Sequence, residues 1–253
     1  MNGPMIVIAG AGSGKTRVLT YKIAYLMTQG VDPFNILALT FTNKAAREMK
    51  ERIANIVGDE AKNLWMGTFH SVFARILRIE AHKIGYTSNF TIYDSDDSQK
   101  LVARIIKELN LDKEQYKYKI IFSRISSMKN NFISADQYIN DEEMLLSDKI
   151  SNRPKFHQIY KQYVERCFKA GAMDFDDLLL KTNELLNSYP DTLSKYQNIF
   201  RYILVDEYQD TNHSQYLIIR SLSDKFQNIC AVSYTHLRAH ETGRNLVCRL
   251  LLE

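Results

Sequence analysis

A glycine-rich stretch between an apolar run and a helical pattern constrains the fold of this chain most strongly. The stretch reads AGAGSGKT from Ala9 to Thr16, after the apolar run Met5–Ile8 and before the helix-patterned segment Arg17–Met27. Glycine lets backbone N–H groups come close to phosphate oxygens, and the positive end of the following helix attracts the same anion. The order of strand, loop, Lys-Thr and helix therefore predicts a phosphate-binding loop in an α/β fold.

The loop departs from the usual G-x-x-x-x-G-K-[ST] pattern at one position, because Ala9 stands where the first glycine is expected. Lys15 is expected to reach the outer phosphates, and Thr16 to offer its hydroxyl to Mg²⁺. The predicted nucleotide-binding residues of this segment are Ala9, Gly10, Ala11, Gly12, Ser13, Gly14, Lys15, Thr16 and Arg17.

Two acidic residues far downstream indicate the kind of phosphate chemistry. Ile203–Val205 reads as a short buried strand, and Asp206 follows at its carboxyl end, where open parallel sheets bind their ligands. Asp206 is expected to coordinate Mg²⁺, and Glu207 to polarise a water for attack on the γ-phosphate. Such a glutamate favours hydrolysis over phosphate transfer to a small molecule. The alternative is that both acids cap the helix that follows.

Five motifs in the same order resemble the N-terminal part of a superfamily 1 DNA helicase of the UvrD, PcrA and Rep group. The motifs are AGAGSGKT at Ala9–Thr16, LTFTNKAAREM at Leu39–Met49, GTFHS at Gly67–Ser71, DFDDLL at Asp174–Leu179 and VDEYQDT at Val205–Thr211. The resemblance covers nearly all of residues 3–230, and five motifs in order are far more specific than one.

The resemblance implies a RecA-like parallel sheet flanked by helices, with an all-helical subdomain inserted into it. It also implies an enzyme that hydrolyses ATP with Mg²⁺, moves 3′ to 5′ along single-stranded DNA and unwinds duplex DNA. Glu207, Asp206 and Lys15 would be the catalytic residues, with Thr16 and Asp206 holding Mg²⁺. Gln209 would contact the nucleotide site and link its state to the DNA.

The family also places two of the motifs along the path of the DNA. The residues expected to bind DNA are Phe41, Thr42, Asn43, Thr68 and His70. Stacking of a base on an aromatic ring is worth about 1–3 kcal/mol, which suits Phe41. Composition alone favours Phe41 as a core residue, and a histidine between a strand and a helix is more often structural.

Helical patterns dominate between about residues 85 and 172. Ser95–Leu109, Tyr118–Lys129 and Pro154–Phe168 are predicted helices, separated by polar connections such as Ser134–Glu143. We therefore expect an α/β domain built from residues 1–84 and 173–232, with residues 85–172 as the helical insertion. The basic residues of the insertion face a DNA backbone or, more often in such patterns, solvent; they include Lys117, Lys119, Arg124 and Lys129.

The acidic cluster Asp174-Phe175-Asp176-Asp177 has a structural explanation. Carboxylates at the start of a helix cap it and complement its dipole. A paired-carboxylate nuclease would need a further acidic cluster for a second metal ion, and none supports this one. The family carries the same motif beside its DNA channel, so we expect a positioning role.

Composition and charge fit a cytoplasmic enzyme. The net charge of +4 permits a polyanion partner, and Cys167, Cys230 and Cys248 have no paired spacing, which favours a reducing compartment. No signal peptide or membrane anchor is expected. A P-loop kinase and a non-catalytic nucleotide- or DNA-binding remnant remain as alternative functions.

Both ends of the chain depart from the expected pattern. In the family, a preceding segment carries a glutamine that contacts the adenine, so we expect that Met1 is not the native start. The family also has a second motor domain whose arginines reach the γ-phosphate, so we expect the fragment alone to be a poor motor. Residues 233–253 read as a non-native tail. Val232–Thr242 and Asn245–Glu253 resemble a sequencing adapter translated in one frame. The alternative for this tail is a zinc site at His236 and His240.

Overall fold

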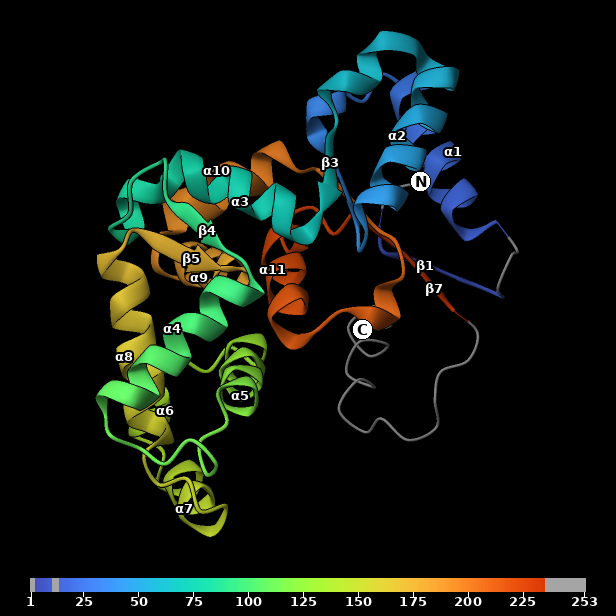
Figure 1. The fold of residues 1–253 in the computed structure, drawn as a ribbon. Coiled ribbons are helices and arrows are strands. Elements are labelled where there is room, and N and C mark those ends of the chain that lie inside the picture. Colours follow the sequence, from blue (N-terminus) through green and yellow to red (C-terminus); the bar gives the residue numbers. More distant parts are fainter. Residues whose placement is uncertain (1–2, 11–13, 235–253) are drawn as a thin grey trace. The chain divides into compact units, whose positions relative to one another are not determined.

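The computed structural model describes residues 3–10 and 14–234 of the chain (Figure 1). These residues divide into two compact units. The first draws on residues 1–72, 186–211 and 215–253, and the second on residues 73–185 and 212–214. The predicted tail covers residues 233–253. Ser233 and Tyr234 lie in a strand, whereas residues 235–253, with His236 and His240, lie outside the described part, and the tail hypothesis stays a prediction.

A five-stranded parallel sheet forms the centre of the first unit. Its strand order is β1-β7-β6-β2-β3, and every neighbouring pair is parallel. The strands are β1 (Met5–Ala9), β2 (Ile36–Thr40), β3 (Trp65–Thr68), β6 (Tyr202–Val205) and β7 (Ile229–Tyr234). The predicted α/β class with a parallel sheet flanked by helices is confirmed. The connections between parallel strands contain helices, because two parallel strands cannot be joined by a tight turn.

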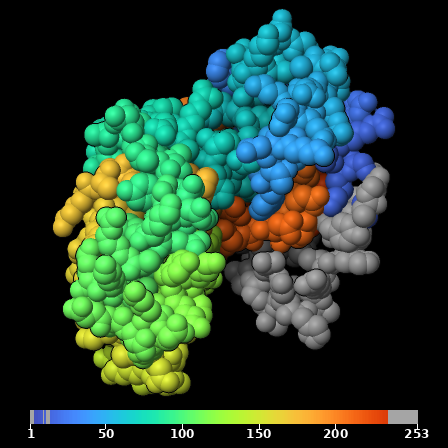
Figure 2. Space-filling view, in the orientation of Figure 1, coloured from blue at the N-terminus to red at the C-terminus, as the bar shows by residue number. Residues whose placement is uncertain are grey.

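Two long helices bury one apolar core against this sheet. Helices α1 (Lys15–Thr28) and α2 (Asn43–Val57) lie side by side (Figure 1). Leu19 and Ile23 of α1 and Met49 and Ile53 of α2 pack with strand residues such as Leu204. The opposite face of α2 is charged and lies on the surface seen in light blue in Figure 2. The unit also contains η1 (Pro33–Asn35), η2 (Gly58–Asn63), α10 (Pro190–Ile199), η4 (Tyr208–Asp210) and most of α11 (His213–Ser223).

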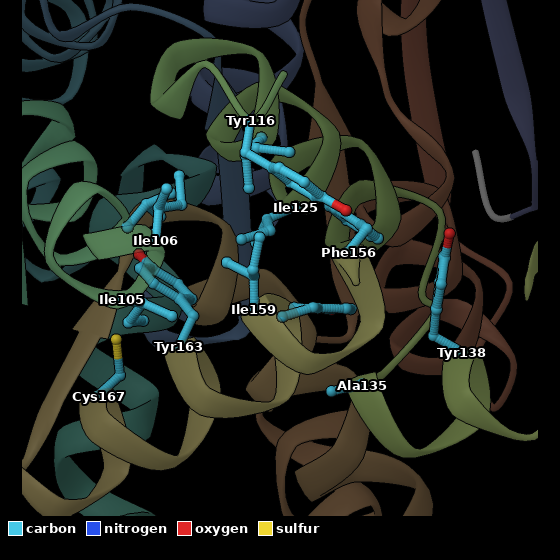
Figure 3. Packing of buried hydrophobic residues seen from close by; sticks show 13 residues of the cluster. Ile105, Ile106, Tyr116, Ile125, Ala135, Tyr138, Phe156, Ile159, Tyr163 and Cys167 are labelled. Atoms are coloured by element: carbon cyan, nitrogen blue, oxygen red, sulfur yellow. The ribbon is translucent and has the colours of Figure 1, made fainter. Parts of the chain in front are cut away.

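The second unit is mainly helical. Its elements are α3 (Phe69–Glu80), η3 (Ala81–Ile84), β4 (Thr91–Tyr93), α4 (Ser95–Glu108), α5 (Tyr118–Asn130), α6 (Ala135–Ile139), α7 (Glu142–Ile150), α8 (Phe156–Lys169), β5 (Ala172–Asp174) and α9 (Phe175–Ser188). Figure 3 shows its core, in which Ile105, Phe156 and Tyr163 are fully buried. No helix among the described residues is long and apolar enough to cross a membrane.

The inserted unit is not all-helical, which corrects one part of the prediction. Strands β4 and β5 form a two-stranded parallel sheet, with Ile92 opposite Met173. Strands of three residues are too short to show an alternating pattern in the sequence. The prediction that Ser134–Glu143 is a polar connection between helices is also wrong, because this segment contains α6. Ser134 and Gln137 form a capping box at the start of this helix.

The compact units divide the chain at residues 72 and 185, whereas the sequence pattern placed the insertion at residues 85–172. Hydrogen bonds explain the longer helical unit. Arg78 of α3 donates to the carbonyl of Ser88 at 2.9 Å, and Lys129 of α5 pairs with acidic residues at the start of α9. These contacts join α3 to the segment before β4, and α9 to α5.

A buried ion network lies at the centre of the second unit. The Lys129 ammonium, with a side chain 0% exposed, lies 2.7 Å from Asp174 and 2.8 Å from Asp177. The Tyr163 hydroxyl donates to Asp174 at 2.7 Å. Burial opposes the charge on Lys129, but the two carboxylates outweigh it and raise its pKa. Burial and the charge of Asp174 raise the pKa of Asp177 to about 6.

Ion pairs within the second unit give two of the basic residues and the acidic cluster a structural role. Lys129 does not face a DNA backbone, because its ammonium is enclosed between carboxylates. Arg124 lies 2.6 Å from the buried Asp148 and over the ring of Phe156. The carboxylates of Asp174 and Asp177 also accept each other's backbone N–H, as expected of capping residues. The carboxylates of Asp174 and Asp177 are therefore paired with the Lys129 ammonium.

Replacement of Lys129 tests how much this network contributes to the free energy of unfolding. Lys129→Met leaves two buried carboxylates without their cation, so the free energy of unfolding is expected to fall by about 3–5 kcal/mol at pH 7. The loss shrinks as the pH falls from 7 towards 4. Without the cation, the folded carboxylates have pKa values above those of the unfolded chain, so the folded state binds more protons.

Urea unfolding followed by circular dichroism, at several pH values and relative to the wild type, measures this effect. Lys119→Met is the matched control, since Lys119 is exposed on the same helix and its replacement is expected to change stability by less than about 0.5 kcal/mol. Equal losses in both variants would contradict the account.

Candidate nucleotide-binding site

The sheet register brings the two predicted phosphate motifs to one edge of the sheet. Ala9 ends β1, Val205 ends β6, and β7 lies between the two strands. The carboxyl ends of parallel strands meet at the same edge, so the segment after β1 lies near Asp206 and Glu207. The backbone N–H of Asp206 continues the ladder and donates to the carbonyl of Leu39 on β2 at 2.9 Å.

Glycine at the end of the loop is required by the backbone. Gly14 precedes α1 with φ 90°, a conformation that side chains disfavour. No side chain caps this helix start, where N–H groups have no intrahelical partner. The positive end of α1 therefore suits an anion. Ala11, Gly12 and Ser13 lie outside the described residues, while Ala9 is the last residue of β1 and Gly10 follows it.

Lys15 and Glu207 form an ion pair across 192 residues of sequence. Their side-chain atoms Nζ and Oε2 are 2.8 Å apart, and the Lys15 side chain is only 11% exposed. Gln209 donates to the same Glu207 oxygen at 2.7 Å. Burial alone would raise the pKa of Glu207, but the hydrogen bonds from Lys15 and Gln209 lower it. Glu207 is therefore held as a carboxylate that faces the phosphate loop.

Glu207 reaches this position through an unusual backbone conformation. Its φ of 47° and ψ of 46° are left-handed, which few residues other than glycine adopt. Glu207 precedes η4 but makes no side-chain cap there, so its carboxylate does not serve the helix-capping role weighed from the sequence. Left-handed backbone outside glycine concentrates at functional sites.

Thr16 and Asp206 form the second contact between the two motifs. The Thr16 hydroxyl donates to Oδ2 of Asp206 at 3.4 Å, and Asp206 is 3% exposed. Burial, followed by the charge of Glu207, raises the pKa of Asp206. A nearby cation would offset both effects. Hydroxyl and carboxylate oxygens are the hard ligands that Mg²⁺ prefers, so this pair fits the expected ion.

Other predicted residues lie elsewhere on the same unit. Arg17 is exposed on α1, and its guanidinium lies over the ring of Tyr21, 5.5 Å from the centroid. The Ser233 hydroxyl donates to Oε1 of the Gln209 side-chain amide at 3.0 Å. Sequence reasoning missed both partners. The Arg17-Tyr21 spacing of four residues on a predicted helix was a usable signal, whereas nothing in the sequence links Ser233 to Gln209.

The first group of predicted DNA-binding residues follows the end of β2. Phe41 is half-buried, and its ring lies 5.4 Å from the ring of Phe69, so Phe41 is not a fully enclosed core residue. The Thr42 hydroxyl caps α2 by accepting the backbone N–H of Ala45 at 3.1 Å. Asn43 is exposed at the start of that helix.

The second group follows the end of β3. The Thr68 hydroxyl accepts the N–H of Ser71 at 3.3 Å, and the Ser71 hydroxyl donates to the Thr68 carbonyl. A Cβ at Gly67 would lie 2.5 Å from the Ser71 hydroxyl oxygen, so a larger residue here would displace the Ser71 side chain from its bond to Thr68. His70 is half-buried in the first turn of α3. The structure gives the two threonines local roles, and their contact with DNA stays a prediction.

The sequence profile of the UvrD/REP helicase N-terminal domain matches residues 1–233. The chain belongs to this family. It is 44% identical over 231 residues to the ATP-dependent DNA helicase PcrA of Staphylococcus epidermidis strain RP62A, a match that covers 91% of this chain and 31% of the relative. The PcrA of Staphylococcus aureus strain NCTC 8325 gives the same identity and coverage. The chain thus spans about a third of the length of these relatives.

Replacement of Thr42 tests its role as the cap of α2. Thr42→Ala removes the acceptor for the Ala45 N–H and is expected to lower the free energy of unfolding by about 0.5–2 kcal/mol. Thr42→Ser keeps the acceptor and most of the stability. Thermal and urea unfolding measure the change. Asn43→Ala, next to the cap, is the control, and a loss there as large as in Thr42→Ala would contradict the capping role.

Proposed function

We propose that this chain binds Mg²⁺-ATP and belongs to the motor of an ATP-dependent DNA helicase that acts in the cytoplasm. The complete enzyme would hydrolyse ATP, move 3′ to 5′ along single-stranded DNA and unwind duplex DNA. One observation carries the proposal. The contacts Lys15-Glu207 and Thr16-Asp206 bring a lysine and a hydroxyl that suit phosphate and Mg²⁺ next to two carboxylates that suit Mg²⁺ and water.

Each residue of the site has a role that follows from its position. The start of α1 and Lys15 bind the phosphates, while Thr16 and Asp206 hold Mg²⁺. The ion, when bound, neutralises charge on the phosphate oxygens. Glu207 accepts a proton from the attacking water, and Gln209 orients the Glu207 carboxylate through their 2.7 Å hydrogen bond.

The Lys15-Glu207 contact has to break before Lys15 can bind phosphate and Glu207 can act on water. Lys15 cannot keep its 2.8 Å contact with Glu207 and also use its full charge on phosphate. A polyphosphate competes for Lys15 with several negative charges, whereas Glu207 offers one. Nucleotide binding therefore loosens the pair and frees the carboxylate for water. In this scheme the general base becomes available only when its substrate is present.

Contacts with DNA extend the proposal beyond the nucleotide. Phe41, Thr42 and Asn43 follow β2, Thr68 and His70 follow β3, and both strands lie in the sheet that carries Asp206. We propose that these segments bind single-stranded DNA, with a base stacked on the half-buried ring of Phe41. Gln209 would pass the nucleotide state to them through its neighbours in the acidic motif.

Replacement of the general base tests the catalytic assignment. The assay uses a chimera in which the 231 matching residues of this chain replace their counterparts in the Staphylococcus epidermidis helicase. Glu207→Gln is expected to lower DNA-stimulated phosphate release by about 10²–10⁴-fold and to leave Mg²⁺-ATP affinity nearly unchanged. Glu51→Gln, an exposed residue of α2, is the control. Full phosphate release by Glu207→Gln, or a phosphorylated small molecule as product, would contradict hydrolysis through Glu207.

The chain of 253 residues assayed alone is expected to bind Mg²⁺-ATP weakly, with little turnover. In the family the γ-phosphate also meets arginines of a second motor domain, and such a group is worth about 10³–10⁵ in rate. Phosphate release with and without single-stranded DNA, together with a strand-separation assay, measures this. Robust unwinding by the chain alone would refute the proposed division of the motor.

A further inference from the structure

Helix α7, at one end of the second unit, buries a charged residue and exposes apolar ones (Figure 1). Among the nine residues of this helix, all within the described range, Asp148 alone is buried. Leu146 and Ile150 are 56% and 76% exposed. A surface helix ordinarily turns its apolar residues to the core and its charged residues to water. The face of α7 that meets water is therefore of the kind that other helices bury.

A polar anchor fixes α7 in this orientation. Oδ1 of Asp148 lies 2.6 Å from the Arg124 guanidinium and accepts the Tyr138 hydroxyl at 2.9 Å. Residues follow each other by about 100° around a helix, so the positions two before and two after Asp148 lie on the opposite side. Those positions are Leu146 and Ile150. Rotation of α7 to bury them would leave Arg124 and the carboxylate without each other.

The surroundings of this apolar face are acidic. Asp136 of α6 and Glu142 and Glu143 of α7 are exposed, and with Asp141 they line a shallow hollow beside the helix. In the part of the chain that the structure describes, none of the three exposed acids forms an ion pair. Between residues 130 and 152 the sequence has a single cation, Lys149. Such a surface repels the phosphates of DNA and attracts a cationic partner.

We propose that the exposed face of α7 is a docking surface for a basic amphipathic helix of a partner protein. Leu146 and Ile150 are four residues apart, the spacing at which two helices exchange apolar contacts. Glu142 lies one turn before Leu146, and Glu143 is next to it, so both carboxylates flank the apolar pair and meet lysines or arginines of the partner. Two apolar contacts with charged neighbours suit a weak, reversible association.

The test uses the complete chain and a fluorescein-labelled peptide of leucine and lysine. The peptide has about 18 residues, enough to form a helix, with leucine along one face. Fluorescence anisotropy measures its affinity. Leu146→Ser/Ile150→Ser is expected to weaken binding about tenfold or more, because both apolar contacts are lost. Glu142→Lys/Glu143→Lys is expected to weaken it about fivefold or more, and this loss shrinks as salt is added.

Matched variants elsewhere on the surface make the test specific. Ile79→Ser changes an apolar residue of α3 that is 48% exposed, and Glu51→Lys changes an exposed acid of α2. Both are expected to bind the peptide like the wild type, as is Lys15→Ala, because docking on α7 does not involve the nucleotide site. Circular dichroism and the urea midpoint show that each variant is folded. A peptide with glutamate in place of lysine is expected not to bind.

Several results would overturn the inference. One is equal affinity of Leu146→Ser/Ile150→Ser and the wild type, and another is an equal loss in Ile79→Ser. Sedimentation of the chain alone tests a second copy as the occupant, and a dimer that Leu146→Ser/Ile150→Ser abolishes would replace the partner protein by that copy. Duplex DNA binding that is lost in the same double variant would assign the face to nucleic acid instead.

Discussion

The alignment of β1, β7 and β6 in one parallel sheet is the constraint on which the site depends. It places the end of β1 and the end of β6 at the same edge, although about 190 residues separate the groups that then meet. Lys15 reaches Glu207 and Thr16 reaches Asp206 only because this register holds. The helical unit interrupts the sequence between β3 and β6, and the sheet still forms with all neighbouring strands parallel.

Charged groups are used differently in the two units. The Lys129 ammonium is enclosed by the carboxylates of Asp174 and Asp177 and lies over the ring of Tyr163, so its charge is neutralised within the fold. Lys15 pairs with a single carboxylate at the end of a strand, on a residue with left-handed backbone. A fully enclosed pair costs several kcal/mol to break, whereas a partly exposed pair is exchanged more easily for another anion. This contrast explains why one lysine stabilises and the other is suited to bind a ligand.

The sequence predicted the features that depend on local pattern. The buried runs of β2 and β6, the glycine-rich loop and the acids after β6 all carry signals within a few residues. It did not predict β4, β5, α6 or α10, because short strands and short helices leave no clear period and their stability comes from partners distant in the chain. The same limit applies to side chains. Lys129 reads as a surface residue, and only folding shows that Asp174 and Asp177 surround it.

The central claim is that the phosphate loop and the acidic motif form one site in which nucleotide replaces Glu207 as the partner of Lys15. A structure of the chain with Mg²⁺ and a non-hydrolysable ATP analogue tests this most directly. The account predicts that Lys15 contacts phosphate oxygens, that the ion is bound by Thr16 and Asp206, and that the 2.8 Å Lys15-Glu207 contact is lost. An intact Lys15-Glu207 pair with the nucleotide bound elsewhere would contradict it.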